Sequence, residues 1–160
     1  MTGNATTILP KDKPQIITTR VLNAPRELVW KVLSSPDHLK HFWGPDGFTN
    51  TFKTFDFRVG GEARFTMHGP DGTDWPNRII YRQLDAPRFI QWDHDNGGEG
   101  EIDHKFVGEI ELYEEGHNTR IELRVIEPSM ESRNNIAQYA VEGGKQNLDR
   151  LAAYLAPMMK

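Results

Sequence analysis

The chain of 160 residues is 37% hydrophobic and 26% charged, a balance that favours one soluble globular domain over a disordered segment. Its net charge is -4, and its basic side chains are scattered singly among acids, which excludes the contiguous basic face of a nucleic-acid-binding protein. The absence of cysteine excludes disulfides, thiolate catalysis and cysteine metal sites.

The first 14 residues show no periodic pattern. They contain two prolines, and their one apolar pair, Ile8-Leu9, is too short for a signal-peptide core, so residues 1–14 are expected to form a loose tail. No apolar run in the chain approaches membrane-spanning length. The sequence therefore predicts a cytoplasmic protein with one domain over residues 15–157 and no membrane contact.

Secondary-structure signals follow in a definite order. A β-branched run predicts a strand over residues 15–23, and helical spacing of apolar residues predicts short helices over 25–34 and 37–43, separated by Pro36. A proline-free segment with helical periodicity predicts a long helix over 130–155. Six further strands are predicted between the helices, over residues 49–57, 62–68, 78–84, 88–94, 106–113 and 119–126.

Most of these strands alternate apolar and charged residues, which is typical of an antiparallel sheet with one solvated face. The alternation breaks near Thr54, where a β-bulge is expected. Gly60-Gly61 marks a turn between two strands, because glycine adopts positive φ at low cost. The order predicts an α+β fold in which six or seven antiparallel strands curve around the long C-terminal helix.

A set of short motifs accompanies this order of elements over residues 16–155. The motifs are Arg20, Ala24-Pro25, Glu27, Val29-Trp30, Pro36, Leu39, Trp43-Gly44-Pro45, Asp56-Phe57-Arg58, Gly60-Gly61 and Leu148-Asp149-Arg150-Leu151. Together they resemble the SRPBCC superfamily, the helix-grip proteins that include START domains and the birch-pollen allergen. Within it, the chain is similar to the branch homologous to the C-terminal domain of the activator of the 90-kDa heat-shock-protein ATPase.

The resemblance implies a helix-grip fold with a hydrophobic cavity between the sheet and the long helix. It also implies two other roles, a stress-related protein interaction of co-chaperone type and the cyclase or hydrolase chemistry of some superfamily relatives. Gly143-Gly144 stands where family members often carry a Gly-Trp pair, so the ligand end of the cavity is expected to differ. One module is expected to fill the 160 residues, without the separate N-terminal domain of the co-chaperone.

A curled sheet around one helix also predicts an apolar pocket from packing alone, because such a sheet is hard to fill to normal density. Strand alternation points Ile79, Ile90 and Ile110 inward, towards Ala140 of the last helix, and Trp43 is expected at the mouth. The predicted ligand-binding residues are Trp43, Phe65, Met67, Tyr81, Trp92, Phe106, Ile136, Tyr139 and Gly143. The alternative is that all of them are ordinary core residues.

The six histidines do not predict a metal site, because no helical i, i+4 pair with an intervening glutamate occurs. His38 and His41 could share a helix face, and Asp93-His94-Asp95 forms a loose acidic cluster with His104. Successive strand residues point to opposite faces, however, so this cluster cannot converge within a strand. His94 is either a polar anchor at the pocket rim or a solvated residue at a strand end.

Catalytic signals are weak. No Gly-x-Ser-x-Gly elbow occurs, and the serines fall where caps and turns use them. A carboxylate in an apolar cavity would have a raised pKa and could act as an acid or a base. We therefore expect a non-enzymatic protein, without metal or cofactor, that binds a small apolar molecule, either lipid-like or an aromatic metabolite. A co-chaperone-like interaction module and a cyclase or hydrolase are the alternatives, and a homodimer is compatible with the sequence.

Overall fold

An eight-stranded antiparallel sheet and three α-helices make up the protein in a computed structural model that describes residues 4–159. The strands are β1 (Thr6–Ile8), β2 (Gln15–Leu22), β3 (Thr49–Phe55), β4 (Glu62–His68), β5 (Asp74–Asp85), β6 (Phe89–Asp95), β7 (Phe106–Glu115) and β8 (Asn118–Ile126). The helices are α1 (Arg26–Leu33), α2 (Pro36–Phe42) and α3 (Met130–Leu155), and a short 3₁₀-helix η1 (Ala156–Met159) follows α3. The strand order is β1-β2-β8-β7-β6-β5-β4-β3.

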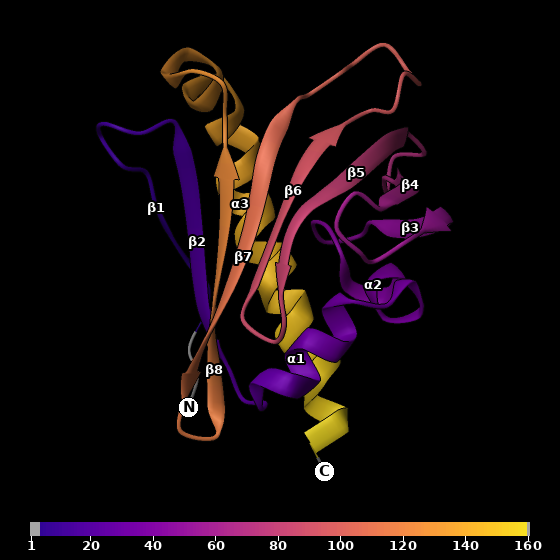
Figure 1. Ribbon diagram of the computed structural model, residues 1–160. Helices are drawn as coiled ribbons and strands as arrows, with labels where there is room; N and C mark the ends of the chain where they lie inside the picture. The colour runs from indigo at the N-terminus through magenta and orange to yellow at the C-terminus, as the bar shows by residue number, and fades with distance from the viewer. Residues whose placement is uncertain (1–3, 160) are drawn as a thin grey trace.

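The predicted α+β helix-grip arrangement is confirmed, since the curved sheet wraps around α3 (Figure 1). In Figure 1, α1 and α2 lie beside the C-terminal half of α3, near the bottom of the view, whereas none of the described helices lies beside its N-terminal half. The bulge near Thr54 is also confirmed, because the β3–β4 register shifts between Phe52 and Thr54. A second, unpredicted bulge shifts the β5–β6 register between Tyr81 and Gln83.

A loose tail is predicted over residues 1–14, and β1 corrects this expectation for the described part, residues 4–14; it also raises the strand count above the predicted six or seven. It pairs with the edge of β2, with Thr6 opposite Thr19 and Ile8 opposite Ile17. The backbone N–H of Ala5 also donates to the Asp149 carboxylate of α3 at 3.1 Å. β1 has only three residues, too few for an alternating pattern to be recognised in the sequence. Residues 1–3 lie outside the described residues.

The turn between β3 and β4 uses its two glycines for different reasons. Gly60 has a φ of +81°, as the sequence predicted. Gly61 does not have a positive φ, but a Cβ on it would lie 2.1 Å from the backbone oxygen of Asp56. The second glycine is therefore required by a close approach of backbone, and not by its dihedral angles.

The two halves of α3 are packed differently. Its C-terminal half buries Leu148, Leu151 and Leu155 in a core shared with the sheet, α1 and α2. Between Arg133 and Asn147, by contrast, α3 has no buried residue. Burying a leucine side chain contributes about 2 kcal/mol to stability, so the C-terminal half holds the helix in place. The N-terminal half stands over the sheet without filling the space beneath it.

Arg150 of α3 organises the loop that follows α2. Its guanidinium donates to the backbone carbonyl of Pro45 at 2.7 Å, of Phe48 at 2.9 Å and of Gly44 at 3.0 Å. One turn earlier on α3, the Asn147 side-chain oxygen accepts from the N–H of Gly44 at 3.2 Å. The Trp-Gly-Pro and Leu-Asp-Arg-Leu motifs, far apart in the sequence, are thus partners in one contact.

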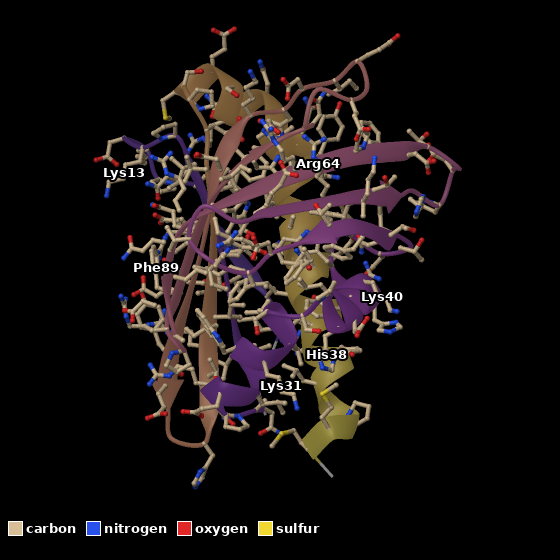
Figure 2. The ribbon with its side chains drawn as sticks, turned by 45° about the vertical axis from the view of Figure 1, so that its right-hand side comes forward. Lys13, Lys31, His38, Lys40, Arg64 and Phe89 are labelled. Carbon is tan, nitrogen blue, oxygen red and sulfur yellow. The ribbon has the colours of Figure 1, made fainter. Side chains whose placement is uncertain are left out.

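The outer face of the sheet carries the charged residues that the alternation predicted. Arg124 pairs with Glu109 and Glu111, each at 2.8 Å, and with Glu122 at 3.0 Å. Phe89 lies on this face, away from α3 (Figure 2). Because the outer face is charged and solvated, the candidate site belongs on the opposite face, beneath α3.

Replacing Arg150 by methionine should lower the free energy of unfolding by about 1–3 kcal/mol, because several buried or half-buried carbonyls lose their donor. Urea unfolding followed by circular dichroism measures the loss. The control is Arg82→Met, which removes an exposed ion pair with Asp93 at 2.8 Å and should cost at most about 1 kcal/mol. Equal losses in the two variants would contradict the role given to Arg150.

Candidate functional site

A groove of about 300 Å³ lies between the N-terminal half of α3 and the sheet, and we name it the α3 groove. Its volume is at the lower end of the range for small-molecule sites. Its walls are mostly apolar, and within residues 4–159 no Lys or Arg side chain lines it. Seven of the nine predicted ligand-binding residues line the α3 groove: Trp43, Met67, Trp92, Phe106, Ile136, Tyr139 and Gly143.

These residues occupy different depths. Trp92 is 4% exposed and forms the floor, whereas Tyr139 is 69% exposed and stands on the rim. Tyr139, predicted as a ligand-binding residue, therefore borders the α3 groove only at its exposed rim. The N-terminal half of α3 is not pressed onto the sheet, so a side chain on the flank of the helix remains in solvent.

The remaining two predicted residues, Phe65 and Tyr81, lie outside the α3 groove. They line a separate void of about 30 Å³ together with Ile79, Ile90 and Ile110. Such a void has room for one or two water molecules and none for an organic ligand. Phe65 and Tyr81 are thus core residues, because Leu33 of α1 and Leu39 of α2 fill the space next to them that was predicted to be a cavity.

The adjacent glycines of α3 serve two purposes. A Cβ on Gly144 would lie 2.8 Å from the Thr18 hydroxyl oxygen, so this glycine lets the helix approach β2 closely. A Cβ on Gly143 would meet only Pro45, at 3.4 Å, and Gly143 lines the α3 groove. The sequence alone does not show which glycine permits close packing and which leaves open space. In the structure, Gly144 permits the close approach and Gly143 borders the open space.

Trp92 separates the α3 groove from the small void, since it lines both. In the sheet it lies opposite Tyr81 of β5 on one side and opposite Gly108 of β7 on the other. A Cβ on Gly108 would lie 2.2 Å from the indole ring, so only glycine leaves room for the ring over β7. Trp43 contacts Trp92 edge to face, with ring centroids 6.4 Å apart.

The α3 groove continues into a second hollow of about 280 Å³ beside β5. Large apolar side chains are exposed along it, with Trp75 39% and Ile102 63% exposed. The groove and this hollow share four lining residues: Pro45, Met67, His104 and Ile136. The two hollows therefore form one continuous apolar strip that ends at solvent.

His94 lines the second hollow, so it is not a solvated residue at a strand end, and its role as a polar anchor stays a prediction. Its Nε2–H donates to the Asn77 side-chain oxygen at 2.6 Å, and its ring stacks on Phe106 with centroids 4.3 Å apart. The carboxylates on either side pair with arginines instead, Asp93 with Arg82 and Asp95 with Arg78.

His104 and Glu127 form a pair that the sequence analysis missed. The Nε2–H of His104 donates to Glu127 at 2.7 Å, and the Ser132 hydroxyl donates to the other carboxylate oxygen at 2.6 Å. Although burial raises the pKa of Glu127, these two hydrogen bonds outweigh it and hold the pKa below its usual value. Glu127 follows a strand and precedes a proline, a position without any periodic signal.

Metal binding finds no support at the histidines of α2. His38 lies beside α3 (Figure 2), with its Nδ1 2.6 Å from the Tyr154 hydroxyl, and His41 stacks on the same tyrosine at 5.8 Å. Both histidines therefore pack against the same residue of α3. Across residues 4–159, no three His, Asp or Glu side chains gather in a way that could hold a metal ion.

Residues 23–156 match the sequence model of the family described as Activator of Hsp90 ATPase homolog 1-like protein. The chain belongs to this family. In this family member, none of the helices within residues 4–159 combines the length and apolar character needed to cross a membrane. No curated protein shows significant sequence similarity to the chain.

Solved structures share the fold at low sequence identity. Protein Ms6760 from Mycobacterium smegmatis superposes with a TM-score of 0.83 and 19% identity over 97% of both chains. A protein from Arthrobacter aurescens reaches a TM-score of 0.86 with 23% identity, covering 95% of this chain and 91% of the other. Protein NE0264 from Nitrosomonas europaea gives 0.80 with 21% identity over 95% and 99%. At these identities the likeness establishes the fold alone.

The stability of this family member should depend on pH through His94. Burial lowers the pKa of His94 to about 4, and the charge of His104 lowers it further, whereas the backbone hydrogen bond with His104 and the charges of Asp95 and Asp103 do not restore it. In the unfolded chain the imidazole has its usual pKa of about 6.5, so the unfolded state takes up the proton first as the pH falls. The folded state should therefore lose about 2 kcal/mol between pH 7.5 and pH 5.

Urea unfolding at several pH values measures this dependence. His94→Gln keeps an amide N–H for Asn77 and cannot titrate, so its stability should fall less over the same range. If the wild type and His94→Gln lost equal stability over this range, the pH dependence of stability would come from titratable groups other than His94.

Proposed function

We propose that the protein binds a small, largely apolar molecule in the α3 groove and does not transform it chemically. The observation that carries this proposal is the groove itself, an apolar hollow of about 300 Å³ next to solvent. Soluble proteins seldom leave such apolar surface uncovered without a function for it. Family membership supports the proposal, because members are generally ligand-binding proteins.

The apolar surface that a ligand buries in the α3 groove determines the expected affinity. Burying about 300 Å² of apolar ligand surface at about 25 cal/mol/Å² contributes about 7 kcal/mol before the costs of association. Micromolar binding at best is therefore expected for a ligand held by apolar contact alone. Native mass spectrometry of freshly purified protein would reveal any small molecule that stays bound.

Gly143→Leu should abolish binding, because its side chain extends from beside Pro45 into the α3 groove. Leucine is also a better helix former than glycine by up to about 1 kcal/mol, so stability should not fall. The test is equilibrium dialysis with a neutral apolar probe, 2-isopropenylnaphthalene. The control is Ala153→Leu, at an exposed position of the same helix outside the groove, which should bind like the wild type.

Three outcomes can be separated in this experiment. Loss of binding in Gly143→Leu alone supports the groove as the site. Undiminished binding in Gly143→Leu would place the site elsewhere, and absence of binding by the folded wild type would overturn the proposed function.

A second candidate function, an enzyme that moves a proton, is favoured by the His104–Glu127 pair. His104 lines the α3 groove and the second hollow, and its Nε2–H is held at 2.7 Å by the fully buried Glu127 carboxylate. A carboxylate that orients a histidine leaves the other ring nitrogen ready to accept a proton. A ketone bound in the groove would then lose a proton from the carbon next to its carbonyl and regain one from solvent.

Deuterium exchange tests this second candidate. In D₂O, the methyl protons of 2-acetylnaphthalene should disappear from the proton NMR spectrum faster with wild-type protein than with His104→Gln. His38→Gln serves as the control, because His38 contacts Tyr154 and does not line the groove. Equal exchange rates with wild type and His104→Gln would contradict the enzyme and favour the non-enzymatic binding protein.

A further inference from the structure

The indole nitrogen of Trp92 is a buried hydrogen-bond donor without an acceptor. Trp92 is 4% exposed, and its Nε1 finds no hydrogen-bond partner within residues 4–159. Buried polar groups in proteins are nearly always hydrogen-bonded, because leaving one unpaired forfeits its bond with water. An unpaired donor in the wall of a ligand-sized hollow therefore points to a partner from outside the chain.

The neighbours of Trp92 explain why the chain supplies no acceptor. On one side lies Tyr81, whose pKa is raised by burial alone, and on the other lies Gly108, which has no side chain. Trp43 approaches with an aromatic edge. The backbone groups on either side are used by the antiparallel ladder from β5 to β7. The row of side chains beside the indole thus offers apolar surface and no carbonyl or carboxylate.

A trapped water is a poor substitute for the missing acceptor. The void behind Trp92 measures about 30 Å³, and its lining side chains are apolar except for Trp43, Tyr81 and Trp92. Buried waters usually make about three hydrogen bonds, and the lining side chains of this void offer a water two indole N–H groups and one hydroxyl, without any carbonyl or carboxylate. On its other side, the indole ring lines the α3 groove, which is large enough to hold a ligand.

Charge narrows the chemistry of the acceptor. Within the described residues, no Lys or Arg lines the α3 groove, and His104 is already paired with Glu127. A carboxylate at the floor would be desolvated without a counter-ion, which is strongly unfavourable. A neutral oxygen acceptor loses far less on leaving water, and the indole N–H replaces the bond it gives up.

We propose that the Trp92 indole N–H binds the ligand directly, and that the α3 groove therefore selects apolar molecules bearing a neutral carbonyl oxygen at the end that reaches its floor. This inference rests on the proposed function and adds the chemical class of the ligand. Trp92 then contributes the hydrogen bond that selects the ligand, and the apolar walls contribute most of the binding free energy.

Three naphthalenes of similar shape test the inference by isothermal titration calorimetry. 2-Isopropenylnaphthalene carries a carbon in place of the carbonyl oxygen, 2-acetylnaphthalene carries the neutral acceptor, and 2-naphthoate carries a negative charge. The wild type should bind the ketone about tenfold more tightly than the alkene, because one buried donor becomes paired. The carboxylate should bind more weakly than the ketone.

Two variants locate the donor. Trp92→Phe keeps an aromatic ring and removes the N–H, so it should bind ketone and alkene about equally. Trp30→Phe removes the indole N–H of a tryptophan that packs on Phe57 outside the α3 groove, and it should keep the preference for the ketone. Circular dichroism checks that both variants are folded.

A measurement on the wild type covers the case in which Trp92→Phe does not fold. The indole N–H resonances of the four tryptophans are resolved in a nitrogen–proton correlation spectrum, and single Trp→Phe variants of the other three assign that of Trp92. The Trp92 resonance should move to lower field with the ketone and not with the alkene, as expected when its proton becomes hydrogen-bonded.

The outcomes separate the two proposals. If neither naphthalene binds, the proposed function fails. If alkene and ketone bind equally well to the wild type, the α3 groove is a binding site but the role of Trp92 is refuted. A ketone preference that survives in folded Trp92→Phe, or carboxylate binding as tight as ketone binding, would also overturn the inference.

Discussion

The site depends on how α3 is held against the loop after α2. Arg150 donates to several carbonyls of residues 41–48, and Asn147 accepts from Gly44 in the same loop. These bonds join the two most distinctive motifs of the chain and place Trp43 next to Trp92. On the opposite side of the helix, Arg20 of β2 pairs with Asp149, so the segment 147–150 is attached to both the loop and the sheet.

Because the attachment lies near one end of α3, the rest of the helix is free to stand away from the sheet. Leucines of residues 148–155 fill the space beneath the C-terminal half, and the void of about 30 Å³ lies among core residues of the sheet, α1 and α2. Beneath residues 136–144 small side chains and glycines leave the α3 groove open. A single helix thus completes the core with one half and covers the α3 groove with the other.

The polar groups of the site are few, and each has a distinct environment. Trp92 offers an unpaired N–H at the floor, and Gly108 makes room for its ring. His94 is held neutral between Asn77 and Phe106, whereas His104 is oriented by Glu127. Few polar groups among apolar walls are the usual composition of a small-molecule site, where they select the ligand and the walls provide affinity. The unpaired N–H of Trp92 favours the binding of neutral carbonyl compounds, whereas the His104–Glu127 pair favours a proton-transfer enzyme.

The sequence by itself determined the order of the elements, the fold class and about half of the groove lining. Periods of 2 and 3.6 residues identify the faces of strands and helices, and seven of the nine predicted residues meet at the α3 groove. Only the tertiary structure decided that Phe65 and Tyr81 are packed core, that Tyr139 is exposed and that β1 joins the sheet. It also decided that Glu127 meets His104 and that Trp92 lacks a partner. Periodicity reports which side of an element faces inward, whereas the distance between two elements depends on contacts such as those of Arg150, which join residues far apart in the chain.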